Sequence, residues 1–412
     1  MSQGNHAERQ PWPEGLFSRV PYWVFKDPDV FELEQERIHR GPAWSFLCLE
    51  AELPAIGDFK TTFLGKMPVV VARDTDGSIN AFENRCSHRG ALLCIKQRGN
   101  AQDFTCVYHA WRHDLKGNLQ SVAFMRGVKG KGGMPADFKL SDHGPRKLRV
   151  ETFAGLVFGT LSTEVSDLPT YLGPEIGARI RRVLCKPLQV LGTYTQILPN
   201  NWKLYFENTK DTYHSSLLHT FFGTFKVSRL SQPGAIRVAN GHHVGYTLPH
   251  PGGKDHEFDK ESLRSNQEGK FGLEDPRLLE VRDEFGDGCN VQLLSVFPGF
   301  VLQHIHNTLA CRQILPVTID RTHLVWTLIG FTDDDPALRE LRMKHANLVG
   351  PAGYVSMEDG AVGGFIQRGI AGCTDEAALV QMGGHGTESQ DTRTTESALR
   401  GFWKAYRSYM EI

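Results

Sequence analysis

The chain has 412 residues, 40% of them hydrophobic and 23% charged, which is the composition of a globular protein with two or three domains. Its 46 Lys and Arg residues nearly balance its 47 Asp and Glu residues, which argues against a nucleic-acid binder that works by positive charge. No apolar run approaches the roughly 20 residues of a membrane span, and the polar N-terminus lacks a signal core. We therefore expect a cytoplasmic protein without membrane or nucleic-acid partners.

The expected elements divide the chain into three parts. Residues 1–42 predict an N-terminal arm and a short helix that pack on the domain at the C-terminal end of the chain. Residues 43–163 contain short β-like runs separated by turns and predict a small all-β domain. Residues 164–412 predict a larger α+β domain that holds an antiparallel sheet.

In the third part, hydrophobic periodicity separates strands from helices. Strands are expected at 190–197, 243–247, 291–297, 300–306, 308–315 and 323–329. Helices are expected at 171–184, 202–219, 335–348 and 397–410, with a charged helical insertion at about 259–284. The glycine-rich stretch 360–386 is expected to form loop and short helix.

Two short cysteine–histidine arms give the sharpest signal in the chain. Cys86 and His88 form one arm, and Cys106 and His109 form the other. A Rieske [2Fe–2S] cluster needs two thiolates on one iron and two imidazoles on the other, and two such arms supply them. Zinc sites usually keep like ligands together, which this alternating order does not. The pattern predicts a [2Fe–2S] cluster on these four residues, with structural zinc, a catalytic Cys–His pair or ordinary core residues as alternatives.

A second metal site is indicated on the helix expected at 202–219. His214 and His219 form an H-x4-H pattern, but on an ideal helix they point about 140° apart, because each residue turns about 100°. A shared metal therefore requires the helix to end or distort near 215–216. The acidic pair Glu358 and Asp359 can add the carboxylate that completes a two-histidine, one-carboxylate site for ferrous iron with positions open to O2. Each of these signals is weak alone and gains value from occurring together with the cluster motif.

These motifs, in this order and spacing, resemble the large (α) subunit of Rieske non-haem iron ring-hydroxylating oxygenases. The resemblance implies His214, His219 and Asp359 as ligands of a mononuclear Fe(II), with O2 as co-substrate. It implies Asp211 as a catalytic carboxylate that links His109, a cluster ligand of one subunit, to an iron-binding histidine of its neighbour. The fold it implies is α+β, with a small all-β Rieske [2Fe–2S] domain and a larger catalytic domain of helix-grip (START-like) type.

The resemblance also implies partner chains. Oxygenases of this family carry a small β subunit, and the implied assembly is α3β3. Electrons would come from a separate NAD(P)H-dependent reductase, because this chain has no GxGxxG fingerprint in a βαβ context.

Longer segments resemble the terephthalate-oxidising members of this family, among them 81–93, 198–219 and 350–372. Arg312 and Arg393 fall where those members carry carboxylate-binding arginines, and two arginines can clamp two carboxylates across one ring. The residues around Arg393 by themselves indicate a surface position.

His304 and His306 depart from the family pattern. We expect them at the surface or behind the pocket wall; if they faced the pocket, they could change the substrate preference or make binding depend on pH.

The resemblance implies an enzyme that cis-dihydroxylates an aromatic carboxylate, with terephthalate as the leading candidate substrate. The alternatives are a salicylate- or anthranilate-type hydroxylase and a Rieske electron-transfer protein. The number of oxygen atoms in the product separates the two enzymes, and loss of function on removing His214 separates an oxygenase from an electron carrier.

Overall fold

The computed structural model describes residues 11–250 and 252–412, and the chain divides into two compact units. One unit is His39–Leu168, and the other combines the N-terminal segment up to Ile38 with Pro169–Ile412. The boundaries expected from the sequence, after residues 42 and 163, lie four and five residues from these. Each unit has its own sheet and core, so the two are described separately.

The smaller unit is all-β, as predicted. Its described residues form one antiparallel sheet in the order β2-β11-β10-β5-β4-β3-β6 and a second in the order β7-β8-β9. The strands are β2 Ser45–Leu49, β3 Asp58–Leu64, β4 Met67–Arg73, β5 Ile79–Glu83, β6 Arg98–Asn100, β7 Phe104–Thr105, β8 Arg112–His113, β9 Leu119–Ser121, β10 Lys147–Phe153 and β11 Leu156–Thr160. Short 3-10 helices occupy Glu50–Glu52 and Leu140–Asp142.

The valines of β4 show how this sheet buries both of its faces. Side chains alternate along a strand, so Val69 and Val71 pack into one core while Val70 packs into another. The core around Val70 also contains Cys86 and Cys106. One face of β4 thus packs in the same apolar core as the two cysteines.

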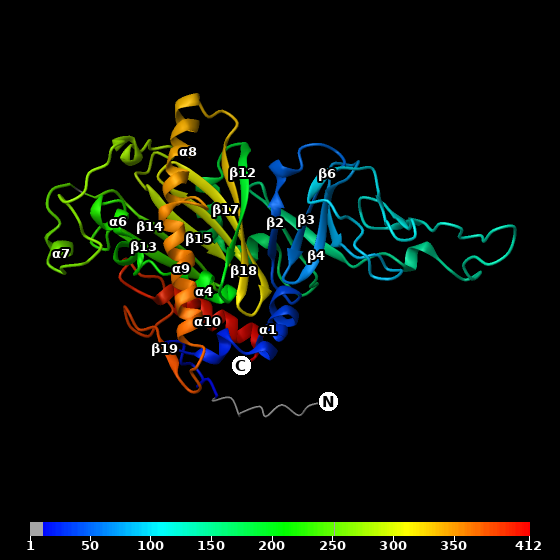
Figure 1. The fold of residues 1–412 in the computed structure, drawn as a ribbon, viewed down its shortest axis with the longest axis horizontal. Coiled ribbons are helices and arrows are strands. Elements are labelled where there is room, and N and C mark those ends of the chain that lie inside the picture. Colours follow the sequence, from blue (N-terminus) through cyan, green and yellow to red (C-terminus); the bar gives the residue numbers. More distant parts are fainter. Residues whose placement is uncertain (1–10, 251) are drawn as a thin grey trace. The chain divides into compact units, whose positions relative to one another are not determined.

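The larger unit is built on an antiparallel sheet, which confirms the predicted fold (Figure 1). In the part of the unit that the structure describes, its order is β12-β18-β17-β16-β15-β14-β13. The strands are β12 Leu188–Leu198, β13 Gly234–Ala239, β14 His242–Thr247, β15 Val291–Val296, β16 Phe300–Ile305, β17 Thr308–Thr318 and β18 Arg321–Phe331. All six strands expected from the sequence are present, and β13 is an additional edge strand.

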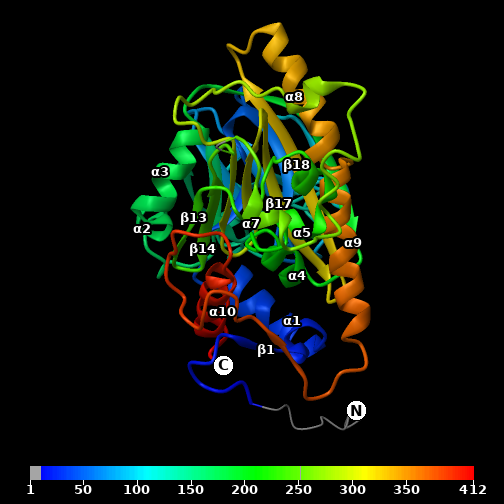
Figure 2. The same cartoon turned by 90° about the vertical axis from the view of Figure 1, so that its left-hand side faces the viewer.

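Helices flank this sheet on several sides (Figure 2). They are α1 Pro28–Glu34, α2 Leu168–Leu172, α3 Pro174–Val183, α4 Trp202–Asn208, α5 Ser215–Leu218, α6 Thr220–Thr224, α7 His256–Asp259, α8 Pro336–Val349, α9 Tyr354–Gly369 and α10 Ser397–Met410. The remaining elements are 3-10 helices at Tyr22–Phe25 and Pro276–Leu279, a π-helix at Gln35–His39 and the paired strands β1 Arg19–Pro21 and β19 Ala377–Leu379. The helices among the described residues include none that is long and apolar enough to cross a membrane.

The helix expected at 202–219 is not continuous. It ends at Asn208, and irregular backbone follows until α5 begins at Ser215. Asp211 explains the break, because its side chain accepts hydrogen bonds from the backbone N–H groups of Tyr213 (2.9 Å) and His214 (3.3 Å). Aspartate that bonds to nearby backbone in this way offers an alternative to the helical pattern.

One other helix expectation was wrong, and another underestimated the length of a helix. The stretch 259–284 is largely irregular, with only α7 at its start and a 3-10 turn near its end, because Gly269, Gly272 and Pro276 interrupt it. Conversely, the glycine-rich segment from Gly360 begins inside α9, which runs to Gly369.

Close packing explains the glycines of α9. A Cβ on Gly363 would lie 2.2 Å from the Asn200 side-chain nitrogen, and one on Gly360 would lie 3.0 Å from that of Gln196. These glycines let α9 approach the chain beneath it, so tertiary packing overrides their low helix propensity.

Buried hydrogen bonds to Glu34 attach α1 to the larger unit. Its carboxylate accepts from Lys203 Nζ (2.6 Å), Trp202 Nε1 (2.7 Å) and the Tyr406 hydroxyl (2.6 Å). Because Trp202 and Lys203 open α4, these contacts fix the start of the helix that leads into the Asp211 loop.

Candidate metal centres and substrate pocket

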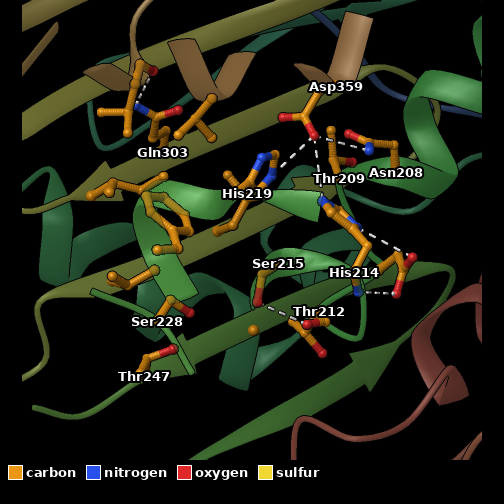
Figure 3. A pocket seen from close by; sticks show the side chains of 18 of the residues that line it. Asn208, Thr209, Thr212, His214, Ser215, His219, Ser228, Thr247, Gln303 and Asp359 are labelled. Atoms are coloured by element: carbon orange, nitrogen blue, oxygen red, sulfur yellow. Dashed lines mark hydrogen bonds and ion pairs between the residues drawn. The ribbon is translucent and has the colours of Figure 1, made fainter. Parts of the chain in front are cut away.

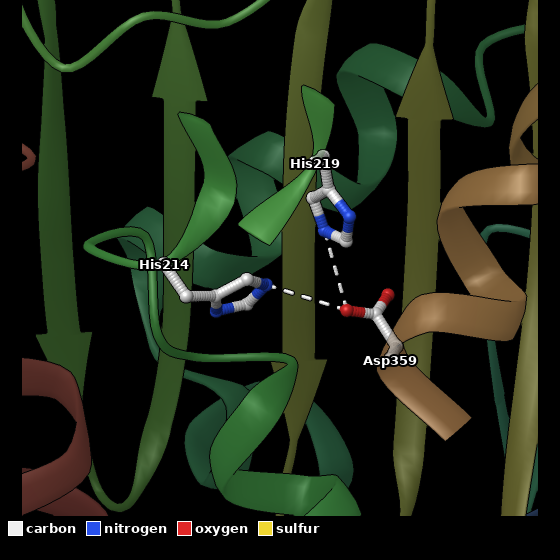
Figure 4. Close-up of side chains that lie close together, drawn as sticks. All are labelled: His214, His219 and Asp359. Carbon is white, nitrogen blue, oxygen red and sulfur yellow. Dashed lines mark ion pairs between the residues drawn. The ribbon is translucent and has the colours of Figure 1, made fainter. Parts of the chain in front are cut away.

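Three side chains from separate elements converge in the larger unit (Figure 4). His214 Nε2 lies 3.4 Å from Asp359 Oδ1, and His219 Nε2 lies 3.3 Å from the same oxygen. One donor atom from each residue lies within 4.8 Å of the other two. Two imidazoles and a carboxylate on one side of an open pocket are the donor set of mononuclear ferrous oxygenases, so these residues fit the iron that the sequence predicts.

The interruptions around α5 are what bring the two histidines together. His214 is the N-cap of α5, and His219 lies between α5 and α6 in an extended conformation, with φ −84° and ψ 96°. The helix therefore breaks at both ends of α5 rather than at 215–216. The distortion required by the H-x4-H spacing is present, but at different residues from those expected.

Each of the two imidazoles has a carboxylate beside its Nδ1 atom. Asp211 Oδ2 lies 3.2 Å from His214 Nδ1, and Glu358 Oε2 lies 2.7 Å from His219 Nδ1. A carboxylate on the second ring nitrogen fixes the orientation of a metal-binding histidine and raises its basicity. The Asp211 contact agrees with the predicted proximity to His214, although it is made in a loop rather than on one face of a helix.

The contact of Glu358 with His219 was not predicted. The acidic pair at 358–359 was visible in the sequence, but only the fold shows that the two carboxylates reach different nitrogens of one ring. Asn208 Nδ2 also donates to Asp359 Oδ1 at 3.2 Å, and this contact orients the carboxylate from the side of α4.

The charges of this site favour a bound cation. Burial opposes ionisation of His214, but the carboxylates of Asp211 and Asp359 outweigh it and raise its pKa to about 10. The pKa of His219 is raised in the same way by Asp359 and Glu358. Burial likewise opposes ionisation of Asp359, yet the two imidazoles hold its pKa well below the usual range. A divalent metal can replace the two protons that these carboxylates attract.

The four predicted cluster residues lie together in the smaller unit. Cys86 and His88 follow β5, and Cys106 and His109 lie between β7 and β8. The Nδ1 atoms of His88 and His109 are 3.1 Å apart, and both cysteines are buried. Burial raises the pKa of Cys86, and the adjacent Cys106 sulfur raises it further, so a deprotonated pair of thiols here needs metal cations beside it. This donor set fits a [2Fe–2S] cluster.

An aromatic side chain covers one of the cluster histidines. The Trp111 ring stacks on His88 with centroids 4.8 Å apart and planes inclined by 10°. Trp111 is itself buried in the core that contains Cys86 and Cys106. The stack fixes the orientation of the His88 ring relative to that core.

The candidate iron ligands line a pocket (Figure 3). Arg312 and Arg393 line the same pocket, and both are buried. Arg312 projects from β17, donates from Nη1 to the Tyr205 hydroxyl at 2.9 Å and lies 4.0 Å from the centre of the Trp326 ring. Neither arginine forms an ion pair with a carboxylate in the part of the chain that the structure describes. The pocket therefore presents two buried cations that lack an anion.

Arg393 is buried rather than exposed, contrary to what its polar sequence neighbours indicate. Its Nη1 donates to Ser228 Oγ at 2.9 Å, and its Nη2 donates to the backbone carbonyl of Arg229. Thr212 Oγ1 donates a hydrogen bond to the Arg393 backbone carbonyl at 2.7 Å. Burial lowers the pKa of Arg393 to about 10, which still leaves the guanidinium charged near neutral pH. Only the fold reveals these contacts, because they join segments more than 150 residues apart.

His304 and His306 do not line the pocket. His304 lies on the other face of β16, where its Nδ1 is 3.3 Å from Arg182 Nη1, and the His306 ring centre is 5.1 Å from that of His345. Both histidines are buried, because α3 and α8 cover them. The expected position behind the pocket wall is therefore confirmed, and the alternative of a surface position is wrong. Burial lowers the pKa of each to about 3, which leaves both rings neutral near neutral pH.

Comparison with known proteins identifies the family. Residues 43–130 match the Rieske [2Fe-2S] domain, and residues 184–412 match the ring hydroxylating alpha subunit (catalytic domain). The chain belongs to the alpha subunits of Rieske ring-hydroxylating oxygenases. This alpha subunit is 54% identical over 401 residues to the terephthalate 1,2-dioxygenase terminal oxygenase component subunit alpha 2 of Comamonas sp., a match that covers 97% of each chain. It is 48% identical over 402 residues to the anthranilate 1,2-dioxygenase large subunit of Burkholderia cepacia, with 97% of this chain and 95% of the relative covered.

A solved structure supports the same assignment of fold. Naphthalene 1,2-dioxygenase from Rhodococcus sp., bound to indole, superposes with a TM-score of 0.79 at 24% identity, covering 95% of this alpha subunit and 94% of that chain. Family membership confirms the predicted enzyme class and both cofactors, a Rieske [2Fe–2S] cluster and a mononuclear iron. The zinc and electron-carrier alternatives are thereby excluded, and the alpha subunit is the oxygenase component of a multicomponent system.

Proposed function

We propose that this oxygenase cis-dihydroxylates terephthalate or a closely related aromatic carboxylate. The observation that carries the proposal is the pair of buried guanidinium groups, Arg312 and Arg393, in the pocket of the candidate iron ligands. A buried charge without a partner is costly, so two such cations in one pocket favour a ligand that brings two anions. The 54% identical relative named for terephthalate supports this choice.

Seven residues are assigned to the two cofactors in this proposal. Cys86, Cys106, His88 and His109 would hold the cluster, and His214, His219 and Asp359 would hold the iron. When bound, the two centres supply electrons and activate O2. Asp211 and Glu358 keep the Nε2 atoms of the two histidines turned toward Asp359, because each engages the opposite ring nitrogen.

The pocket residues bind and orient the aromatic ring. Each guanidinium can pair with a carboxylate through two parallel hydrogen bonds, which fixes direction as well as charge. Apolar side chains of Phe222, Ile305 and Val355 line the same pocket as the arginines and would exclude water from the ring. Two arginines in one pocket favour a para-dicarboxylate over benzoate, whose single carboxylate leaves one cation unpaired.

A hydroxylase of the anthranilate or salicylate type is the second candidate. One arginine suffices for a monocarboxylate, and Arg312 alone meets that requirement. The 48% identical relative named for anthranilate supports this reading.

Product analysis with labelled oxygen separates the two candidates, because the substrate consumed separates a terephthalate enzyme from an anthranilate enzyme and the label count separates dihydroxylation from the single hydroxylation of salicylate. The reduced, iron-loaded enzyme is supplied with 18O2 and with terephthalate, benzoate, salicylate or anthranilate, and labelled atoms are counted by mass spectrometry. We expect a terephthalate cis-diol with two labelled atoms, and the same reaction in H2 18O with ordinary O2 is the control. One labelled atom in salicylate, with terephthalate unchanged, would contradict the two-arginine clamp.

We also propose that Asp211 links neighbouring copies of this chain. Its Oδ2 lies 3.2 Å from His214 Nδ1. The family resemblance implies that Asp211 also contacts the cluster ligand His109 of the next copy. This role requires an assembly of several copies, and we propose an α3β3 assembly with a small β subunit. A separate NAD(P)H-dependent reductase would supply the electrons, and both proteins would be cytoplasmic.

Changing Asp211 to Asn tests this link, because the amide keeps the size of the side chain but loses the charge. We expect product formation to fall by about 100-fold, with iron and cluster contents unchanged. Light scattering on the enzyme purified with its β subunit should give the mass of an α3β3 hexamer. A monomeric enzyme with full activity would refute the link between copies.

A further inference from the structure

Gln303 is a buried pocket residue that the proposed terephthalate clamp leaves unexplained. It projects from β16 into the pocket, and its side chain is fully buried (Figure 3). Its Nε2 donates to the Val349 carbonyl at 3.1 Å. Its Oε1 accepts no hydrogen bond from any residue that the structure describes.

The orientation of this amide is fixed by its neighbours. The Val349 carbonyl also accepts from Ser356 Oγ at 3.3 Å, so only a donor can face it. Turning the Gln303 amide over would place two oxygens against each other. The amide oxygen is therefore the atom of Gln303 that is left free to accept a hydrogen bond.

Three hydroxyl side chains that also line the pocket, between α4 and α5 and at the start of α5, already donate hydrogen bonds. Thr209 and Ser215 donate to backbone carbonyls, and Thr212 donates to the Arg393 carbonyl. Among the described residues that line this pocket, four fully buried side-chain atoms have no hydrogen bond: Nε of Arg312, Nε of Arg393, Oε1 of Gln303 and Nδ1 of His214. His214 Nδ1 lies 3.2 Å from Asp211 Oδ2, so the other three remain as two cationic donors and one neutral acceptor.

Sheet register places this acceptor beside one of the arginines. Arg312 on β17 pairs with Val301 on β16, and Gln303 pairs with Ala310. Gln303 and Arg312 are therefore diagonal neighbours on the same face of the sheet, about 7–8 Å apart at the backbone and within reach of one ring.

We propose that Gln303 Oε1 binds an amino group on the ring of the substrate, next to the carboxylate held by Arg312. The inference rests on the proposed function, and it names the substrate class as aromatic dicarboxylates with an amino group on the ring, such as 2-aminoterephthalate, whose carboxylates would meet the two arginines and whose amino group would meet Gln303 Oε1. One N–H of that amino group bonds to the neighbouring carboxylate of the ligand, and the second N–H remains for Gln303. Unsubstituted terephthalate brings no donor and leaves the amide oxygen unpaired.

Equilibrium binding by calorimetry tests this assignment on the intact iron-loaded oxygenase without O2. The probes are terephthalate, 2-aminoterephthalate and 2-methylterephthalate, whose methyl group has the size of the amino group but cannot donate. We expect 2-aminoterephthalate to bind about 10-fold more tightly than 2-methylterephthalate. This comparison uses the unaltered protein and needs no variant to fold.

The variant Gln303→Met provides the matched control, because it keeps the length of the side chain and removes the acceptor. We expect the 10-fold preference to disappear while the Kd for terephthalate changes by less than about 3-fold, which also shows that the variant pocket is folded. Equal binding of the amino and methyl ligands to the unaltered protein would overturn the inference and leave the terephthalate proposal standing. Failure of all three ligands to bind would overturn both.

Discussion

Replacing Asp359 with Ala is expected to abolish aromatic product formation and to leave the visible absorption of the cluster unchanged. Both candidate iron-binding Nε2 atoms face the Oδ1 of this carboxylate, at 3.4 and 3.3 Å. Without it, two imidazoles remain, and a two-histidine site holds ferrous iron poorly because it lacks the anionic ligand. The cluster residues lie in the other unit of the chain and keep their own donors.

Iron analysis and product analysis together check this expectation. The mononuclear iron should be lost while the two cluster irons and their sulfide stay. Glu358→Gln is the matched control on the same helix: it keeps all three iron ligands and changes the contact with His219 Nδ1, so activity should fall by only about 10- to 100-fold. An Asp359→Ala enzyme that retains iron and forms product would show that another group supplies the carboxylate.

The sequence predicted the strands of the larger unit far better than the segments that carry the iron site. Strands such as β16 and β18 have clear hydrophobic patterns and pair with neighbours close in sequence, so local information determines them. The extent of helix α9 was not predicted for the opposite reason, because it depends on tertiary packing rather than on the local sequence. Its glycines oppose a helix locally, and only the side chains of Asn200 and Gln196 beneath them explain why glycine is needed there.

The chemistry of the site was more predictable than its geometry. His214 and His219 could be named from spacing and resemblance, but the break that aims them at one point depends on Asp211 bonding to its own loop. The contact of Glu358 with His219 and the contact of Gln303 with Val349 were not predicted, because each joins distant segments of the chain. Such contacts arise only when the sheet and helices are assembled.

The second large effect is expected at Arg393. Replacing it with Met should lower kcat/KM for terephthalate by about 100- to 1,000-fold, because the second carboxylate would be buried without its cation, a loss of about 3–4 kcal/mol. Benzoate has no second carboxylate, so its turnover should be unchanged or improved. Arg312→Met should lower turnover of both substrates, because each needs one cation.

Arg393→Lys separates the charge of the guanidinium from its shape. Lysine keeps the positive charge but cannot donate in the fork that reaches Ser228, the Arg229 carbonyl and a carboxylate together, so we expect a smaller loss, about 10-fold. Thermal unfolding of each variant reports whether loss of the Ser228 contact destabilises the fold. If Arg393→Met turned over terephthalate and benzoate with unchanged relative efficiency, Arg393 would be a structural residue of the pocket wall. A selective loss of terephthalate turnover would instead mean that two separated segments, the β17 strand and the loop before α10, each contribute one half of the recognition of a dicarboxylate.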